Sequence, residues 1–258
     1  MRSPDEVALV ERLAAEGLNP CQVARVSGIP RGTVRDWLVG RGPPGIRDGA
    51  DCCSRCGHAR HSRTPLDQPT YSYLLGMYLG DGCISTMPRG VYRLRIACDG
   101  EYPSIIEEVA AAIGKIVPVS KVGIQRRKGS GCVEVYSYSK AWPCLFPQHG
   151  SGPKHERRIF LESWQEEIVE THPEGFVRGL LHSDGCRVRN RVKGKEYPRY
   201  FFSQVSDDIR ALFCGSLDQL GIRYTRSAPK HVSIARAVSV RRLDEFVGPK
   251  RGALSQSR

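Results

Sequence analysis

The sequence predicts an α+β fold: two αββαββα units related by a pseudo-twofold axis, preceded by a small all-α domain. The main observation is an internal repeat, in which YLLGMYLGDGCIS at 73–85 is echoed by FVRGLLHSDGCRV at 176–188. After each copy we expect the same elements: a strand pair, an amphipathic helix, a second strand pair and a closing helix. The second observation is a helical pattern, with caps and tight turns, in the first 42 residues.

Residues 1–42 are expected to form three helices. Asn19-Pro20 caps a short second helix from about Cys21 to Val26, and Gly28 marks the turn into a third helix from about Arg31 to Leu38. The segment GLNPCQVARVSGIPRGTVRDWL resembles the helix-turn-helix of recombinases and small bacterial regulators. A DNA-reading helix of this kind exposes Arg31, Thr33 and Arg35. A helical cap or a protein-contact module is the alternative.

Residues 43–68 form a predicted linker, rich in Gly, Pro and polar residues, that contains the run CCSRCGHARH. Four of its side chains are ligands of the kind that zinc knuckles use: Cys53, Cys56, His58 and His61. The loop that normally separates two ligand pairs is missing, so two interpretations stay open. One is a zinc site. The other is a solvated segment that binds nothing or takes its missing ligand from elsewhere.

The remainder of the chain, 69–258, is predicted to be one duplicated domain. Its copies pair element by element: residues 69–155 with 172–252, the amphipathic helix at 103–116 with that at 207–222, and a closing Gly-Pro-Lys at 152–154 with another at 248–250.

Each motif begins with an apolar helix that ends in Asp-Gly. Small residues four apart share one face of each helix, and this spacing lets two helix backbones approach closely. The expected helix-interface residues are Gly76, Gly80, Gly179 and Ser183. The glycine after each aspartate is expected to take the left-handed helix C-terminal conformation. Asp81 and Asp184 are then expected at adjacent helix C-termini.

Two carboxylates at adjacent helix C-termini are electrostatically unfavourable, because each opposes its helix dipole and the two repel each other. A divalent cation between Asp81 and Asp184 removes both problems. Hard oxygen ligands favour Mg²⁺ or a similar ion over zinc. Beside a basic surface, such an ion suits hydrolysis of phosphodiester bonds.

The segments LLGMYLGDG (74–82) and VRGLLHSDG (177–185) resemble the paired motifs of the LAGLIDADG homing endonucleases, in the single-chain, two-motif form. The resemblance covers roughly 69–258. It implies two motif helices at the centre and saddle-shaped β-sheets that grip DNA on either side. It also implies that Asp81 and Asp184 are catalytic and bind the divalent metal.

The chain departs from the family pattern at the earlier acidic position of each motif, which is Leu79 in the first copy and His182 in the second. The basic residues that assist catalysis in the family fall in weakly patterned regions of this sequence. Lys128 and Lys230 are the candidates for that role.

Basic residues alternate with uncharged ones after both motifs, as Arg93 and Arg95 after the first and Arg187, Arg189, Arg191 and Lys193 after the second. Period-two alternation places each row on one face of a strand, where it matches a phosphate track or a line of DNA base contacts. A solvated face is the alternative, but such a face normally mixes signs and these rows contain no acid. Acidic residues gather instead in the helical stretches, which we expect to back the sheets.

Composition limits the function classes. The 258 residues carry 39 Lys+Arg against 27 Asp+Glu, a net charge of +12, of which residues 69–258 supply +10. A basic chain favours a polyanionic partner, nucleic acid first. The sequence shows neither a membrane span nor a signal peptide, so its 10 Cys are expected to be thiols or metal ligands. Cys83 and Cys186, which follow the motifs, are expected to be buried small hydrophobes.

The predicted function is a site-specific endonuclease that cuts double-stranded DNA with Mg²⁺ or a similar ion, as a cytoplasmic monomer with internal pseudo-symmetry. One alternative is a DNA-binding regulator that retains the fold but does not cut DNA. The predicted N-terminal helix-turn-helix is the reason for considering it. A nuclease embedded in an intein is disfavoured, because the sequence lacks a splicing-type C-terminal His-Asn. The balance of 30 Arg to 9 Lys favours a GC-rich bacterial or phage genome.

Overall fold

The computed structural model describes residues 4–38 and 66–248, except 119 and 193. These residues fall into two compact units, one with the first three helices and one with the remaining elements, and each is described by itself. Within the described ranges, no helix is long and apolar enough to cross a bilayer. The predicted zinc ligands Cys53, Cys56, His58 and His61 lie outside the described residues.

The N-terminal unit consists of α1 (Pro4–Ala15), α2 (Pro20–Ser27) and α3 (Arg31–Leu38). Asn19 caps α2 as expected: its side-chain oxygen accepts from the backbone N–H of Gln22 at 3.1 Å, and the Gln22 side chain accepts from the Asn19 N–H at 2.9 Å. Gly28 has φ 71°, which lets the chain reverse between α2 and α3. The core of this unit contains Val10, Leu13, Val23, Ile29, Val34 and Trp37.

The second unit runs twice through one order of elements, which confirms the predicted α+β fold class. The first copy contains α5 (Gln68–Asp81), β1 (Gly82–Met87), β2 (Val91–Asp99), α6 (Pro103–Ile116), β3 (Val122–Arg126), β4 (Cys132–Ser139) and α7 (Trp142–Leu145). A connection with α8 (Ser163–Thr171) follows. The second copy contains α9 (Pro173–Asp184), β5 (Gly185–Val192), β6 (Lys195–Ser203), α10 (Asp207–Gln219), β7 (Thr225–Ala228), β8 (His231–Ile234) and α11 (Ala237–Phe246).

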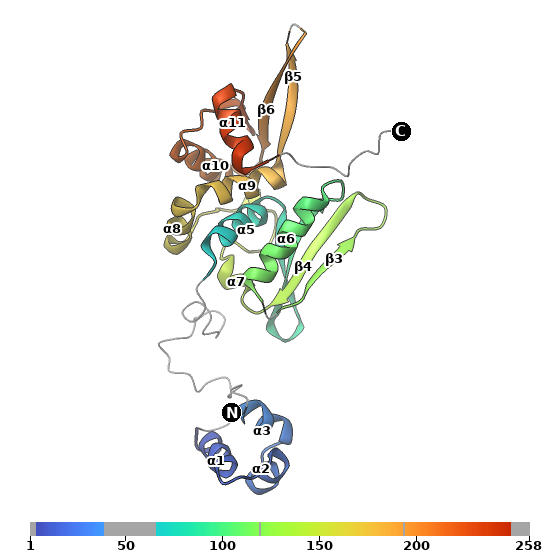
Figure 1. Cartoon of the computed structure of the whole chain (residues 1–258), viewed down its shortest axis with the longest axis vertical. Helices are drawn as coiled ribbons and strands as arrows, with labels where there is room; N and C mark the ends of the chain where they lie inside the picture. Colours follow the sequence, from blue (N-terminus) through green and yellow to red (C-terminus); the bar gives the residue numbers. More distant parts are fainter. Residues whose placement is uncertain (1–3, 39–65, 119, 193, 249–258) are drawn as a thin grey trace. The chain divides into compact units, whose positions relative to one another are not determined.

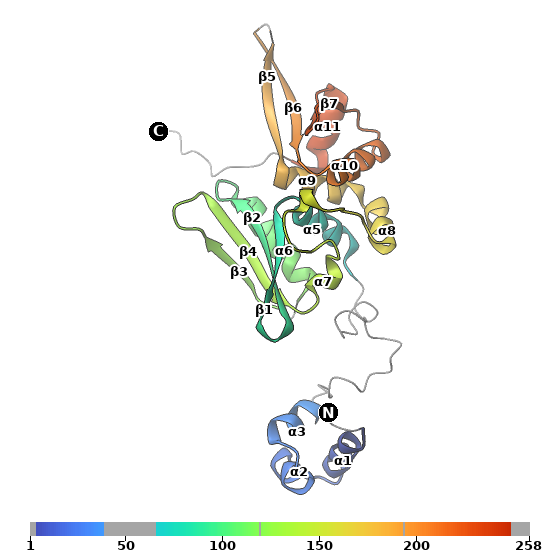
Figure 2. The ribbon, with the colours of Figure 1, turned by 180° about the vertical axis from the view of Figure 1, so that it is seen from behind.

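The strands described in this unit form two antiparallel four-stranded sheets, in the orders β1-β2-β4-β3 and β5-β6-β8-β7. The motif helices α5 and α9 lie side by side at the centre, between the sheets (Figure 1). Helix α6 packs on one face of the first sheet, and α11 packs against β6 of the second. The β5–β6 hairpin extends beyond the rest of its sheet (Figure 2).

Two element boundaries differ from the expected ones. Helix α5 begins at Gln68, and Asp67 caps it by accepting from the Thr70 N–H at 3.0 Å, so residues of the predicted linker belong to the folded domain. Helix α10 ends at Gln219 rather than near 222, and Gly221, at φ 66°, turns the chain.

The glycines after the two aspartates are extended, not left-handed as predicted. Gly82 has φ −89° and ψ 150°, and Gly185 has φ −106° and ψ 162°. Each strand therefore starts directly at the helix end and passes close over the last turn. A Cβ on Gly82 would lie 2.6 Å from the Tyr78 Cα, and one on Gly185 would lie 2.7 Å from the Leu181 Cα. Glycine is needed at both positions because of this close approach.

Cys83 and Cys186 are exposed, so their predicted burial is wrong. Gly82 and Gly185, which precede these cysteines, are buried against the helix ends. Because side chains alternate along a strand, the cysteine must then point to the opposite, outward face of its sheet.

Candidate active site and nucleic-acid interface

The two motif helices touch through glycine. A Cβ on Gly76 would lie 2.5 Å from the Phe176 carbonyl oxygen and 3.0 Å from the Gly179 Cα. A Cβ on Gly179 would collide with the Tyr73 carbonyl oxygen and would lie 2.8 Å from the Met77 nitrogen. The obstructing atoms are backbone, so the spacing of α5 and α9 requires these two glycines.

The same close packing continues to the helix ends. A Cβ on Gly80 would lie 2.5 Å from the Ser183 Cβ and 2.9 Å from the Asp184 Oδ2. The Ser183 hydroxyl donates back along its own helix, to the Gly179 carbonyl at 3.1 Å. The Asp184 carboxylate therefore lies against the last turn of α5, whose final residue is the exposed Asp81.

Lys154 lies at the same place and was not identified from the sequence. Its ammonium donates to the carbonyls of Tyr78, Leu79 and Gly80, at 2.5, 3.0 and 3.0 Å, and so caps the C-terminus of α5. Burial lowers the pKa of Lys154 to about 8, and the nearby carboxylates of Asp184 and Asp81 oppose that shift. One cation and two carboxylates thus share the ends of the motif helices.

Lys154 and Asp184 border a cavity of about 320 Å³, and the last turn of α5 before Asp81 lines it as well. Gln204 lines it and donates to the Asp184 Oδ2 at 2.6 Å, which fixes the carboxylate. Arg157 also lines it, and its Nε is buried without a hydrogen-bond partner among the described residues. A Cβ on Gly150 would collide with the Arg157 guanidinium, so this glycine makes room for the arginine.

Asp184 on the cavity wall and Asp81 at the end of α5 are the oxygen ligands that this place offers to a divalent cation. Asp81 and Asp184 are hard donors, and the described residues contain no group of three or more His, Cys, Asp and Glu placed to hold a metal. Two carboxylates at one site fit Mg²⁺, which normally binds one or two carboxylates and keeps several waters. A tetrahedral zinc site would need more nitrogen or sulfur ligands.

The predicted catalytic lysines lie elsewhere. Lys128 lies in the β3–β4 turn and Lys230 in the β7–β8 turn; both are exposed, and neither borders the cavity that contains Lys154. The repeated Gly-Pro-Lys at 152–154 is the sequence signal that could have identified Lys154. Its counterpart at 248–250 falls largely outside the described residues.

Both departures from the motif are inside the protein. Leu79 is fully buried. His182 is also buried, and its ring nitrogens face the Tyr73 hydroxyl at 3.1 Å and the Val247 carbonyl at 3.2 Å. Both positions therefore stabilise the helix pair and lie away from the solvent-facing carboxylate of Asp81.

The arginines of the first sheet face outward, but an acid lies among them. Leu94 and Ile96 of β2 are buried, so Arg93 and Arg95 point to the opposite face. Glu134 of the neighbouring strand β4 pairs with both, at 3.5 and 3.8 Å. The alternating segment around Arg93 and Arg95 contains no acid because Glu134 lies on another strand, which the fold places beside β2.

The arginines of β5 share one strand face, but it is the face that carries the buried Tyr200, not the outward face that was expected to contact DNA. Arg187 pairs with Tyr200 in the β5–β6 register, and Tyr200 is buried beneath α11. The Arg187 Nε donates to the Oδ1 of Asp244 on α11 at 2.8 Å. Arg189 and Arg191 follow on the same face of the exposed hairpin. Lys193 lies outside the described residues.

The register identifies the true counterparts of the first row. Gly82 pairs with Ile96 in one sheet and Gly185 with Phe202 in the other, so Arg199 and Phe201 correspond to Arg93 and Arg95. By the same count, His231 corresponds to Glu134. The outward faces of the two sheets therefore carry different chemistry.

In the N-terminal unit, Arg31 and Arg35 are exposed and Thr33 is partly exposed on α3, while Val34 and Trp37 are buried. The three polar side chains thus lie where a partner can reach them.

No protein-family model matches the chain. An uncharacterized protein of Methanocaldococcus jannaschii is 28% identical over 134 residues, which are 50% of this chain and 43% of that protein, so the match spans less than half of the relative's length.

Similar solved structures include I-DmoI in complex with DNA and Mn, at 18% identity over 70% of this chain and 97% of that chain, with a TM-score of 0.48. I-WcaI bound to its DNA recognition sequence is 13% identical over 72% and 84%, with a TM-score of 0.46. The LAGLIDADG meganuclease I-AabMI bound to uncleaved DNA is 14% identical over 68% and 82%, with a TM-score of 0.42.

Proposed function

We propose that the chain is a site-specific, metal-dependent endonuclease of double-stranded DNA, of the homing-endonuclease type. The observation that carries the proposal is the packing of Asp184 against the last turn of α5, which ends at Asp81, with Lys154 close to both carboxylates and a cavity beside Lys154 and Asp184. The helix packing brings two carboxylates close to one cationic side chain, Lys154, although like charges at one site repel each other. These groups suit a site that receives a divalent cation and a phosphate.

Asp81 and Asp184 would hold the cation, preferably Mg²⁺. When bound, it would polarise the scissile phosphate and lower the pKa of a bound water. Gln204 orients the Asp184 carboxylate by its hydrogen bond at 2.6 Å. Lys154 and Arg157 supply positive charge on the wall of the same cavity, where they can bind the non-bridging phosphate oxygens.

Both units contribute DNA contacts in this proposal. The outward sheet faces of the duplicated domain contact the duplex, and α3 of the N-terminal unit adds Arg31, Thr33 and Arg35 as a helix-turn-helix. The N-terminal unit also motivates the second candidate, a regulator that binds DNA without cutting it. Binding without cleavage at any divalent-metal concentration would favour that regulator.

The test is cleavage of a random duplex library by the full chain in Mg²⁺. We expect wild type to cut a subset of sequences, and Asp81→Asn or Asp184→Asn to lower cutting by at least about a thousandfold, because either loss removes a metal ligand. Asp218→Asn, the same change on the exposed side of α10, should cut like wild type. Equal activity of the Asp81 and Asp218 variants, or no cutting by any protein, would overturn the proposal.

A further inference from the structure

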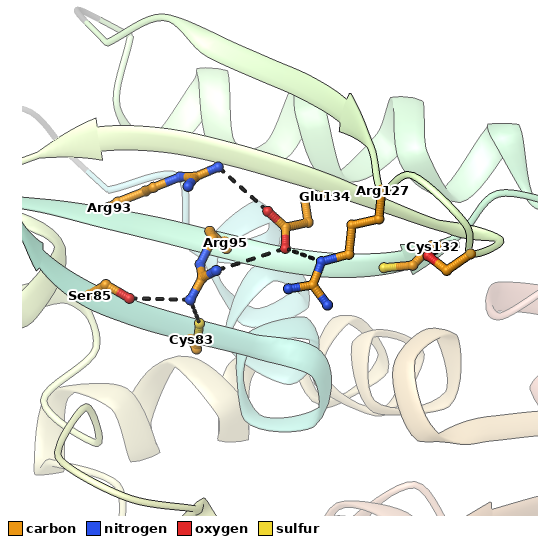
Figure 3. A network of polar contacts seen from close by, with 8 residues as sticks. Cys83, Ser85, Arg93, Arg95, Arg127, Cys132 and Glu134 are labelled. Atoms are coloured by element: carbon orange, nitrogen blue, oxygen red, sulfur yellow. Dashed lines mark hydrogen bonds and ion pairs between the residues drawn. The ribbon is translucent and has the colours of Figure 1, made fainter.

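One carboxylate holds three arginines on the outward face of the first sheet (Figure 3). Glu134 of β4 contacts Arg93 and Arg95 of β2 at 3.5 and 3.8 Å, and Arg127 at 3.0 Å. The Glu134 side chain is only 13% exposed, whereas that of Arg127 is 61% exposed. We call these four residues the arginine cluster.

The strand register explains how the cluster forms. Glu134 lies directly opposite Ala97, whose small side chain leaves space above the sheet. Arg95 lies two residues before Ala97 on the same face, so its guanidinium reaches Glu134 on the diagonal. Arg127 reaches the carboxylate from the turn between β3 and β4.

The guanidiniums are held from several sides. Arg95 donates to the Ser85 hydroxyl at 3.3 Å and to the Cys83 sulfur at 3.1 Å (Figure 3). Arg93 stacks on the Tyr136 ring, 4.4 Å from its centroid. That ring in turn lies over Gly123, where a Cβ would come 2.6 Å from the tyrosine oxygen.

Stability alone does not account for this arrangement. The Nε atoms of Arg93 and Arg95 are buried without a hydrogen-bond partner among the described residues, which costs free energy. Four charged groups have also given up part of their hydration. A surface row of arginines meant only to bind phosphates would need neither the shared acid nor the stacked tyrosine.

We propose that Glu134 determines sequence specificity, by positioning the arginine cluster to read guanine edges in the major groove rather than to bind phosphates. The proposal rests on the DNA-binding part of the proposed function. A fixed guanidinium fork matches the O6 and N7 acceptors of guanine, and this match depends on orientation. The same fork also fits a phosphate, but the neighbouring Glu134 carboxylate repels that anion, whereas a guanine edge carries no net charge. Glu134 therefore weakens phosphate contacts while it orients the base contacts.

The second sheet provides a natural contrast. Its equivalent positions are Arg199, Phe201 and His231, and Arg199 stacks on Phe201 at 5.6 Å. Among the described residues, no carboxylate lies within ion-pair distance of Arg199. We therefore expect the arginine cluster to read guanines only in the half of the DNA target that faces the first sheet.

The test is binding selection from a random duplex library by the full chain, without divalent metal so that nothing is cut. We expect the wild-type target to contain guanines at fixed positions of one half, and Glu134→Gln to lose that preference. Glu134→Gln should also bind a duplex of A·T pairs alone about tenfold more tightly, with a salt slope steeper by about 0.9, the value of one added phosphate contact. Glu245→Gln on α11 changes the net charge equally and should alter neither the selected sequence nor the A·T affinity.

A second variant separates charge from geometry. Arg127→Lys keeps the exposed charge but loses the planar fork, so it should keep the A·T affinity and weaken the guanine preference. Thermal unfolding checks that each variant is folded. If Glu134→Gln selects the wild-type sequence, or if Glu245→Gln shifts the A·T affinity as much, the proposal is wrong.

The outcomes distinguish this inference from the endonuclease proposal. A wild-type chain that selects a guanine-containing sequence but never cuts it would overturn only the endonuclease. A chain that cuts, while Glu134→Gln keeps the wild-type preference, would overturn only the role of Glu134. A chain that binds no duplex would overturn both.

Discussion

Replacing Gly76 with alanine should separate the two motif helices. The added Cβ would lie 2.5 Å from the Phe176 carbonyl oxygen, whereas ordinary contacts begin at 3.4 Å. The obstructing atom belongs to the backbone of α9, so no side-chain rotation relieves the clash. The helices must move apart by about 1 Å, in an interior as densely packed as a crystal.

The cost can be worked out from two opposing effects. Overpacking of a core costs about 1–3 kcal/mol, and a backbone obstruction belongs at the upper end of that range. Alanine regains about 1 kcal/mol of helix propensity over glycine. We expect Gly76→Ala to lower the free energy of unfolding by about 2 kcal/mol. Cleavage should fall by about a hundredfold, because Asp81 and Asp184 move relative to each other by about 1 Å.

Urea unfolding followed by circular dichroism measures the first effect, and a cleavage assay on the selected target measures the second. Gly215→Ala is the matched control, since this glycine lies within α10 and a Cβ there meets no atom within 4 Å. It should raise stability by up to about 1 kcal/mol and leave cleavage unchanged. If Gly76→Ala behaves like Gly215→Ala, the helices are not held together by the contact described above.

Three further outcomes follow from the structure. Asp244 accepts hydrogen bonds from Arg187 and Tyr200, and the hydrogen bond from Arg187 is the main cause of its lowered pKa. After allowance for solvent screening, Asp244→Asn should lower the free energy of unfolding by about 1 kcal/mol at neutral pH. This stabilisation is present above about pH 4 and is lost as pH falls through the lowered pKa, so urea unfolding of wild type and variant should converge in acid. Lys154→Met should lower the cleavage rate at least about tenfold while anisotropy shows retained DNA binding, and equal rates would exclude Lys154 from the site. Deletion of residues 1–65 should leave most of the salt-dependent DNA affinity, because residues 66–258 carry 29 basic and 20 acidic side chains, +9 of the total +12.

The repeat made the central helices predictable. Asp81 and Asp184 occupy matching places in two similar segments, and helical spacing alone puts Gly76 and Gly80 on one face. Local sequence holds this information because a helix is built from neighbours in the chain. The extended glycines after the aspartates were not predicted, since their conformation depends on how closely the strand passes over the helix.

The sheet faces needed long-range information. Glu134 of β4 reaches Arg95 on the neighbouring strand β2, and no local pattern shows which residues of β4 face which residues of β2. Arg187 aligns in the repeat with Ile84, a position packed against the core, and that comparison would have indicated its face. Lys154 lies in the connection between the copies, where no periodicity exists to place its side chain.

The duplicated backbone carries unlike side chains at matching positions, with Arg93, Arg95 and Glu134 on one sheet and Arg199, Phe201 and His231 on the other. A homodimer with the same backbone would have to present one surface twice and would favour a palindrome. This chain is free of that constraint. If both sheets contact DNA, we expect its target to lack dyad symmetry, and the protein to bind it in a single orientation.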